Sequence, residues 1–157
     1  MVENMKSLLL IRCSKRKFKR NDVRAIDLYD GGNFRILRKY YPIETIDVMI
    51  ISAKYGLISP EDKISYYNVT VKDLSKNEKE KLSKNIMEKL NIFLKDNSII
   101  YDKIFFDLGN DYMSLIKDYD FSSYDIIRED GGIGKKLKKL KQFLENNSKG
   151  NIIDFEE

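Results

Sequence analysis

The sequence predicts an α/β domain: a three-layer sandwich with a mostly parallel, Rossmann-like sheet of four to five strands. Short apolar runs, typical of strands buried on both faces, alternate along the chain with segments whose apolar residues recur at helical spacing. Strands and helices in this order form parallel sheets with helices on both faces. The length of 157 residues suits one domain, and no linker rich in proline, glycine or serine divides the chain.

The first half of the chain is expected to provide two central strands and one helix. The first strand is the continuous apolar run at residues 7–11, and a basic loop follows it. Residues 25–40 have the pattern of a helix that could break at its pair of glycines. The second buried strand covers residues 47–51, and residues 52–67 are predicted to form a loop with short turns.

The second half is expected to begin with a long helix. A capping box, in which Ser75 and Glu78 satisfy each other's backbone N–H groups, marks its start. Its apolar stripe consists of Leu82, Ile86, Leu90 and Leu94. The elements predicted to follow are a strand at 103–108, a short helix at 111–118, a strand at 124–127 and a helix at 133–144. We therefore expect a single domain over residues 1–145 and an acidic, flexible tail over 146–157.

The composition excludes several kinds of active site. The chain has no histidine, which removes Ser–His and Cys–His nucleophile pairs and the histidine-based zinc hydrolases. Its single cysteine excludes an internal disulfide and indicates a reducing compartment. No apolar stretch resembles a secretory signal or approaches the roughly 20 residues of a membrane span. We expect a cytoplasmic protein with no membrane partner and predict no metal site; the cofactor and the oligomeric state stay open.

Positive charge is concentrated at the start of the chain. The net charge is only +4, but residues 1–41 carry eleven basic and four acidic residues. A second cluster consists of Lys135, Lys136, Lys138, Lys139 and Lys141. This concentration of positive charge favours an anionic partner such as a phosphate, a nucleotide or a nucleic acid. Exposed lysines also occur as a solvated surface without a partner, and both interpretations stay open.

Polar residues and glycines follow each predicted strand, at residues 12–17, 52–56, 107–110 and 128–134. In a parallel sheet these four segments lie outside the carboxyl ends of the strands, where such sheets bind ligands. Together they supply a thiol, hydroxyls, ammonium groups, carboxylates and glycines. We therefore expect a site for a polar, anionic ligand at this edge of the sheet.

The first of these segments offers a phosphate site and a candidate nucleophile. Ser14, Lys15 and Lys17 could hold a phosphate through hydroxyl, ammonium and backbone N–H groups, although the glycines of a P-loop are missing. Cys13 lies beside these lysines, and nearby cations favour a reactive thiolate. The alternatives are a solvated basic loop and a buried, inert cysteine.

The second segment could contact the sugar or the base of a ligand. Ser52 is a candidate ligand contact, or a nucleophile activated by Lys54 or Lys15. Tyr55, Tyr66 and Tyr67 could stack on a base. The alternative for any single tyrosine is packing in the core, because the chain has ten of them.

Two carboxylates and several glycines complete the candidates. Asp62 and Asp107 are the most plausible acid/base or metal-binding groups; the alternatives are a turn for the first and a contact with a helix N-terminus for the second. Gly56 permits a tight turn beside the ligand. Gly132 and Gly134 open a helix whose N-terminus could bind an anion, or form a glycine turn without a ligand.

Four motifs of the chain form a recognisable set. They are Cys-Ser-Lys-Arg-Lys at 13–17, Leu-Tyr-Asp-Gly at 28–31, Ser-Ala-Lys-Tyr-Gly-Leu at 52–57 and Gly-Ile-Gly at 132–134. With Tyr67, Gly109 and Tyr112, they resemble a small bacterial and archaeal family of unknown function related to the YaaA peroxide-stress proteins. The likeness covers roughly residues 8–144.

YaaA proteins are associated with DNA binding and with protection from oxidative stress. The resemblance therefore implies a nucleic acid, nucleotide or nucleobase as the ligand, and it fixes no reaction. The DNA-binding helix-hairpin-helix of those proteins is an insertion that this chain is too short to hold.

The leading hypothesis is a domain that binds a nucleotide, nucleobase or nucleic acid and acts as an enzyme on a base or a glycosidic bond. The alternatives are a non-enzymatic DNA- or RNA-binding stress-response protein and a sequestering module for a small phosphorylated signal. The predicted catalytic residues are Asp62, Ser52 and Cys13. The predicted ligand-binding residues are Ser14, Lys15, Lys17, Tyr29, Lys54, Tyr55, Gly56, Tyr67, Gly109, Tyr112, Gly132 and Gly134.

Overall fold

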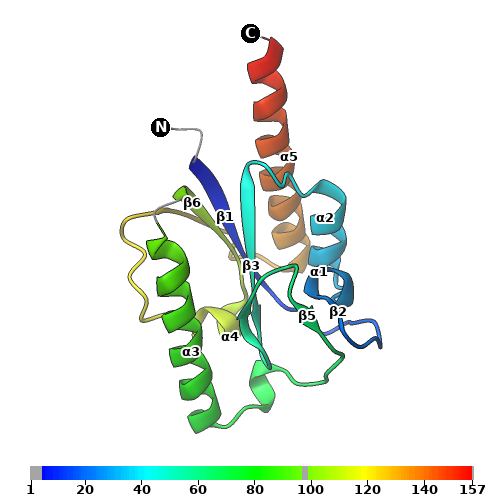
Figure 1. Ribbon diagram of the computed structural model, residues 1–157, viewed down its shortest axis with the longest axis vertical. Helices are drawn as coiled ribbons and strands as arrows, with labels where there is room; N and C mark the ends of the chain where they lie inside the picture. The colour runs from blue at the N-terminus through cyan, green and yellow to red at the C-terminus, as the bar shows by residue number, and fades with distance from the viewer. Residues whose placement is uncertain (1–4, 97–98, 157) are drawn as a thin grey trace.

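The computed structural model describes residues 5–96 and 99–156, with side chains described as far as residue 147. In this part of the chain, five strands form a mixed sheet in the order β4-β3-β1-β6-β7, and β4 alone is antiparallel to its neighbour (Figure 1). The strands are β1 (Met5–Arg12), β3 (Ile46–Ser52), β4 (Gly56–Ile58), β6 (Ile100–Asp107) and β7 (Asp125–Arg128). A separate antiparallel pair consists of β2 (Val23–Arg24) and β5 (Lys63–Ile64). The predicted α/β class and mostly parallel sheet are confirmed.

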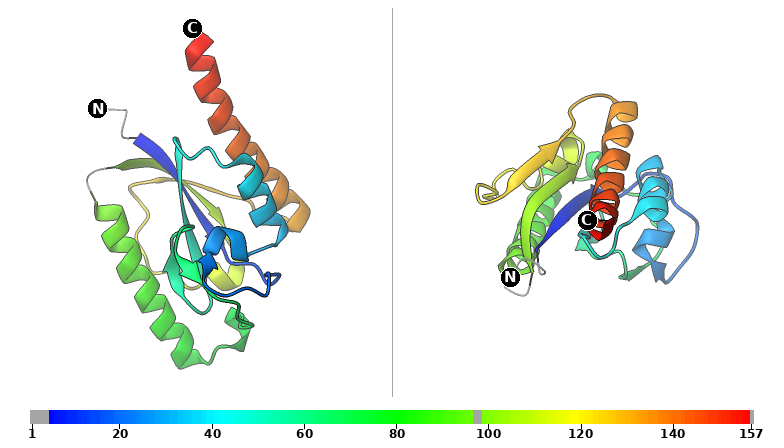
Figure 2. Two further views of the ribbon diagram at one scale, coloured as in Figure 1. Left: turned by 45° about the vertical axis from the view of Figure 1, so that its right-hand side comes forward. Right: turned by 90° about the horizontal axis from the view of Figure 1, so that it is seen from above.

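Helices cover both faces of the sheet (Figure 2). They are α1 (Ala25–Leu28), α2 (Gly32–Tyr40), α3 (Lys76–Lys95), α4 (Asn110–Met113) and α5 (Ile133–Glu156), with a 3₁₀ turn η2 (Val71–Asp73). Along β1, Leu9 and Ile11 pack in the apolar cluster shared with α2 and α5, whereas Leu8 and Leu10 pack in the cluster shared with α3. Because both faces of the middle of β1 are buried, residues 8–11 form an unbroken apolar run. This arrangement is the one expected of a three-layer sandwich.

The single helix expected over residues 25–40 is divided into α1 and α2. The guanidinium of Arg38 donates hydrogen bonds to the carbonyl oxygens of Ile26 and Tyr29, at 2.8 and 2.6 Å, and so satisfies the end of α1. Between the two helices, Asp30 forms ion pairs with Arg38 at 2.8 Å and with Arg35 at 3.0 Å. Side chains of α2 therefore hold the break in place.

Several predicted boundaries are corrected by the structure. The loop expected over residues 52–67 contains β4 and β5, because Gly56, with a φ of +76°, turns the chain back directly after β3. The short helix expected to reach residue 118 ends at Met113, and α5 continues past residue 144 to Glu156. The side chains of residues 148–157 lie outside the described residues, so the flexible tail stays a prediction.

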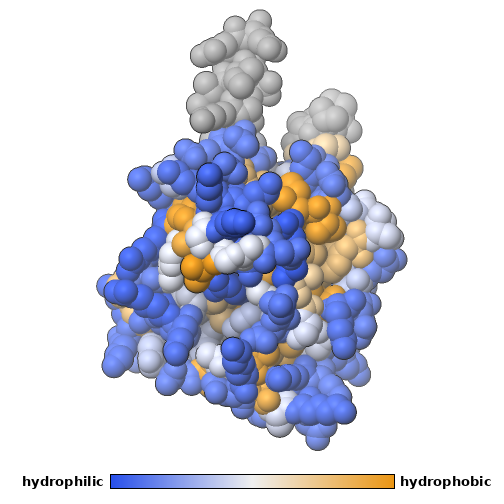
Figure 3. All heavy atoms as spheres, turned by 180° about the vertical axis from the view of Figure 1, so that it is seen from behind, coloured by the Kyte–Doolittle hydropathy of each residue, from blue (hydrophilic) through white to orange (hydrophobic). Residues whose placement is uncertain are grey.

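The surface opposite to the view of Figure 1 is largely hydrophilic, with separate apolar patches (Figure 3). Large apolar side chains that remain exposed include Ile100, Ile126 and Ile133. Among the described residues, no helix combines the length and the apolarity needed to cross a lipid bilayer.

Candidate functional site

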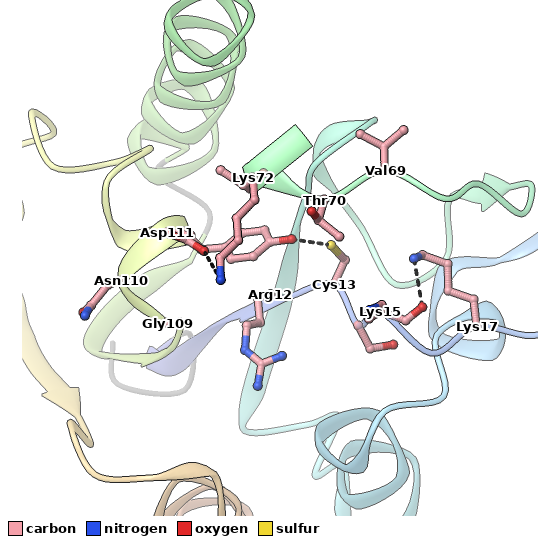
Figure 4. Close-up of a pocket in the computed structure, with 13 residues that line it drawn as sticks. Arg12, Cys13, Lys15, Lys17, Val69, Thr70, Lys72, Gly109, Asn110 and Asp111 are labelled. Carbon is pink, nitrogen blue, oxygen red and sulfur yellow. Dashed lines mark hydrogen bonds and ion pairs between the residues drawn. The ribbon is translucent and has the colours of Figure 1, made fainter. Parts of the chain in front are cut away.

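The carboxyl ends of β1 and β6 mark the point at which the order of the strands reverses. After β1 the chain adds β3 on one side of it, and after α3 it crosses over to add β6 on the other side. Open α/β sheets bind ligands in the crevice at such a point. A pocket of about 420 Å³ lies here, a size typical of small-molecule sites (Figure 4). It is lined by Arg12, Cys13, Ser14, Lys15, Lys17, Val69, Thr70, Val71, Lys72, Gly109, Asn110, Asp111 and Tyr112.

One wall of the pocket is the loop that follows β1. Ser14 fixes this loop, because its hydroxyl donates to the carbonyl of Arg16 at 2.6 Å and accepts the N–H of Gly31 at 3.2 Å. A Cβ atom on Gly31 would lie only 2.7 Å from the Cβ of Ser14, so the close approach of loop and α2 requires glycine. Ser14 lines the pocket as predicted, but its hydroxyl is engaged within the protein.

The opposite wall comes from η2 and α4. The start of η2 is held by a capping box, in which Thr70 donates through its N–H and its hydroxyl to the carboxylate of Asp73, at 2.8 and 3.1 Å. In α4, the hydroxyl of Tyr112 lies 3.1 Å from the sulfur of Cys13 (Figure 4). The two residues are 99 positions apart in the chain and meet because β1 and β6 are neighbours in the sheet.

The lining of the pocket is strongly positive. Its basic side chains are Arg12, Lys15, Lys17 and Lys72, and its carboxylate is Asp111. Lys72 and Asp111 form an ion pair at 4.0 Å. Among residues 5–96 and 99–147, whose side chains the structure describes, the guanidinium of Arg12 has no hydrogen bond or ion pair with a protein group. The lining therefore carries an excess of positive charge, which favours anions over cations.

Lys17 lies deeper in the pocket than the other lysines. Burial lowers the pKa of its ammonium group, and the neighbouring Cys13 opposes this shift. The ammonium nitrogen lies 4.4 Å from the centre of the Tyr67 ring and donates to the carbonyl of Lys15 at 3.2 Å. The ring contact and the hydrogen bond hold this charge between the pocket and the core.

Three buried hydroxyls lie behind the pocket. Tyr29 and Tyr67 are joined at 2.7 Å, and Ser52 and Tyr67 at 2.9 Å. Tyr29 and Ser52 are completely buried, and only 5% of the surface of Tyr67 is exposed, so none of the three can contact a ligand in the pocket. Burial, followed by the neighbouring Cys13, raises the pKa of both tyrosines. The three residues predicted from separate motifs thus form one cluster, as part of the core.

Lys54, Tyr55 and Gly56 line a different, open depression against α3. The hydroxyl of Tyr55 lies 3.3 Å from the carbonyl oxygen of Ser65. A Cβ atom on Gly56 would meet the side-chain oxygen of Asn85 at 3.0 Å, so this glycine serves the turn and the packing of α3. The structure does not bring these three residues into the pocket.

Asp62 and the two glycines of α5 also lie outside the pocket lining. Asp62 is exposed and accepts the N–H of Ser59 at 2.9 Å, which makes it a turn residue. Gly132 and Gly134 are exposed at the start of α5, and a Cβ atom on either would meet nothing within 4 Å. Their predicted anion contact stays a prediction.

Asp107 ends β6 and is buried, with 3% exposure. It accepts a hydrogen bond from the amide of Asn33 at 3.2 Å. Burial raises the pKa of this carboxyl, and Arg12 and Asn33 oppose the shift. In the described part of the chain, no group of three or more Cys, Asp or Glu side chains is placed to hold a metal ion.

The sequence did not indicate the wall formed by Val69, Thr70 and Lys72. These residues lie in a segment without chemical motif, and they reach the pocket only because the chain returns across the carboxyl edge between β5 and α3. The pattern of Thr70 and Asp73 is a capping box and could have indicated a helical turn here. It could not have indicated contact with the loop after β1.

A comparison with protein-family models matches residues 8–142 to a family described as "Family of unknown function (DUF6884)". Comparisons with curated proteins and with solved structures gave no match. The likeness to YaaA proteins rests on the sequence motifs alone and stays a prediction.

Proposed function

We propose that this chain, which belongs to the DUF6884 family of unknown function, binds a nucleotide in the pocket between the ends of β1 and β6. The observation that carries the proposal is the charge of the lining, four basic side chains against one carboxylate. Phosphate groups bind where several cations converge on a partly enclosed site. Lys15 and Lys72 are exposed at its edge, and the phosphate would be held there.

The inner part of the pocket suits a base. Cys13 and Val71 are buried, with 4% and 3% exposure, and Val69 and Tyr112 are partly buried beside them. Apolar and aromatic surface of this kind accepts the flat face of a heterocycle. A ligand with a phosphate at one end and a base at the other matches both parts of the pocket.

A reaction at the base or at the glycosidic bond is a further part of the proposal. Of the three residues predicted to be catalytic, Cys13 lines the pocket, whereas Ser52 and Asp62 do not. A proton transfer to the ligand would use Asp111, the carboxylate of the lining, because a general acid or base must reach the reacting atom. Ligand recovered unchanged after long incubation would favour a sequestering module over an enzyme.

Calorimetric titration with nucleoside 5′-monophosphates and with the matching nucleosides tests the proposal. We expect each nucleotide to bind about tenfold or more tightly than its nucleoside, since hydrogen bonds to charged groups contribute about 1.5–3 kcal/mol. Substituting Lys15→Ala and Lys72→Ala together should remove most of this difference. The matched control replaces Lys76 and Lys84, exposed lysines of α3 outside the pocket, and should change nothing. Absence of nucleotide binding at millimolar concentration would refute the proposal.

A nucleic-acid strand is the second candidate ligand, because a basic loop with aromatic side chains adjoins the pocket. Arg20 lies 4.4 Å from the Phe18 ring, and its carbonyl accepts the N–H of Tyr66, which is 37% exposed. Alternating cations and rings bind single strands. The proposed relationship to YaaA proteins also favours this partner. A labelled single strand and its duplex, titrated across salt, should show a steep negative log–log slope, and a flat slope would exclude this candidate.

A further inference from the structure

The floor of the pocket holds two groups that share one hydrogen bond. The sulfur of Cys13 and the hydroxyl of Tyr112 are 3.1 Å apart, and either can be the donor. While both groups are protonated, they carry two protons for one contact. Within the described residues, neither side chain has another hydrogen-bond partner. One donor of this pair is therefore free, and both residues line the pocket.

The buried hydroxyls behind the floor have the same excess of donors. The oxygen of Ser52 accepts the N–H groups of Lys54 and Tyr55 at 3.2 and 3.0 Å, which occupies both of its lone pairs. Its own proton must then be donated to Tyr67, at 2.9 Å. Tyr67 and Tyr29 share a single contact of 2.7 Å, so one of their two protons is left over. The backbone at the end of β3 thus fixes the direction of donation.

Cys13 lies between the two groups of donors. It packs in the same apolar cluster as Tyr29 and Tyr67, and it is joined to Tyr112. Burial raises the pKa of all three tyrosine hydroxyls, so each keeps its proton at physiological pH. Among the described residues no hydrogen bond joins Tyr29 or Tyr67 to the sulfur, so Tyr112 is the hydrogen-bond partner of Cys13. When the thiol donates to Tyr112, the O–H of Tyr112 is directed to the pocket.

The carboxylate and amide oxygens of the lining side chains belong to Asp111 and Asn110, which are both exposed residues. The carboxylate of Asp111 is paired with Lys72 at 4.0 Å, and the side-chain oxygen of Asn110 accepts from Arg128 at 3.2 Å. The inner pocket therefore offers a donor and lacks a matching free carboxylate or amide oxygen. Its complement is a ligand atom that accepts hydrogen bonds.

We propose that this floor selects nucleotides whose base turns a carbonyl oxygen, rather than an amino group, toward Tyr112. Uracil and hypoxanthine carry a carbonyl at the position where cytosine and adenine carry an amino group. An amino group placed there could donate to Tyr112 only if the tyrosine turned its own proton to the sulfur. The thiol proton of Cys13 would then have no acceptor in a partly buried site, which has a cost. This inference rests on the proposed function and adds to it the class of base that is recognised.

The test compares two pairs of nucleotides by calorimetry: uridine with cytidine 5′-monophosphate, and inosine with adenosine 5′-monophosphate. We expect the carbonyl-bearing member of each pair to bind more tightly, by up to about tenfold, because the donor otherwise left without a partner is a weak S–H group. Tyr112→Phe keeps the ring and removes the hydroxyl, so it should abolish the preference by weakening uridine and inosine nucleotides only. Tyr119→Phe is the matched control, because that hydroxyl donates to Asn91 at 3.2 Å outside the pocket lining.

The outcomes separate the two proposals. Equal affinities within each pair, or tighter binding of the amino-bearing member, would overturn the selection and leave the nucleotide site standing. A preference that persists in folded Tyr112→Phe would overturn the role of its hydroxyl. Absence of binding by all four nucleotides would overturn the proposed function and this inference together. The comparison in the unmodified protein decides the selection even where the variant does not fold.

Discussion

Ser52→Ala tests whether this residue supports the fold or contacts the ligand. Its side chain is fully buried at the end of β3 and accepts the N–H groups of Lys54 and Tyr55. Alanine would remove the acceptor of both groups and one partner of Tyr67, without opening a cavity larger than one oxygen atom. We therefore expect a loss of stability and no direct loss of a ligand contact.

The size of the loss follows from the two orphaned N–H groups. A buried polar group left without its partner costs about 1–3 kcal/mol. Both N–H groups are only partly buried, because Lys54 is exposed and water can reach the turn, so the lower end of this range applies. The free energy of unfolding should fall by about 2–3 kcal/mol, a large fraction for a single domain.

Urea unfolding measures this change. The unfolding midpoints of the natural and Ser52→Ala proteins can be compared when their m-values are equal. Ser59→Ala is the matched control, because Ser59 also accepts an N–H group two residues later, from Glu61 at 3.2 Å, but in an exposed turn. It should cost about 0.5 kcal/mol or less. A Ser52→Ala protein that keeps its stability and loses nucleotide affinity would refute this reasoning and restore Ser52 as a ligand contact.

Three further predictions concern the pocket and its surroundings. Gly31→Ala places a Cβ atom 2.7 Å from the Cβ of Ser14, so it should lower the free energy of unfolding by about 1–3 kcal/mol in thermal or urea unfolding. In the control Gly132→Ala, the new Cβ atom meets nothing within 4 Å, and the free energy of unfolding should hardly change. Equal effects of the two substitutions would contradict the packing argument. Burial lowers the pKa of Lys17, so its charge is lost at a lower pH than that of an ordinary lysine. Nucleotide affinity should fall as the pH rises through the pKa of this ammonium group. Titrations toward higher pH should show the fall beginning at a lower pH in the natural protein than in Lys17→Arg, where the charge of residue 17 persists. A fall at the same pH in both proteins would exclude Lys17 as the cause. Asp62→Ala should leave nucleotide affinity unchanged, because this carboxylate lies in an exposed turn outside the pocket lining, and a tenfold loss in titration would show that the residue reaches the ligand.

The middle of each central strand could be predicted from the sequence because burial on both faces favours a continuous run of apolar side chains there. Leu8 and Leu9 of β1 face opposite layers, and both are completely buried. The same reasoning could not find β4, which has three residues and depends on the turn at Gly56. Short edge strands are decided by pairing with a neighbour, and a one-dimensional pattern carries little information about that pairing.

The sequence indicated the loop after β1 as part of the candidate site, but not the contacts that this loop makes in the folded chain. The rule that ligands bind at the carboxyl ends of parallel strands correctly placed Cys13, Lys15 and Lys17 in one pocket. The sequence could not show that the hydroxyl of Ser14 is used to hold the loop, since that depends on the distance to α2. Nor could it indicate Lys72, whose contact with the pocket exists only in the folded chain.

The absence of histidine leaves the pocket floor without a side chain that changes its charge near neutral pH. Histidine exchanges its proton near neutral pH and so can change from donor to acceptor within one site. Here the floor is built from Tyr112 and Cys13, backed by Tyr29 and Tyr67, and burial raises the pKa of the three tyrosines away from the physiological range. Such hydroxyls keep their protons near neutral pH and remain able to donate. A floor of this kind suits recognition of an acceptor atom better than proton transfer, and for this reason binding, rather than turnover, is the part of the proposed function to test first.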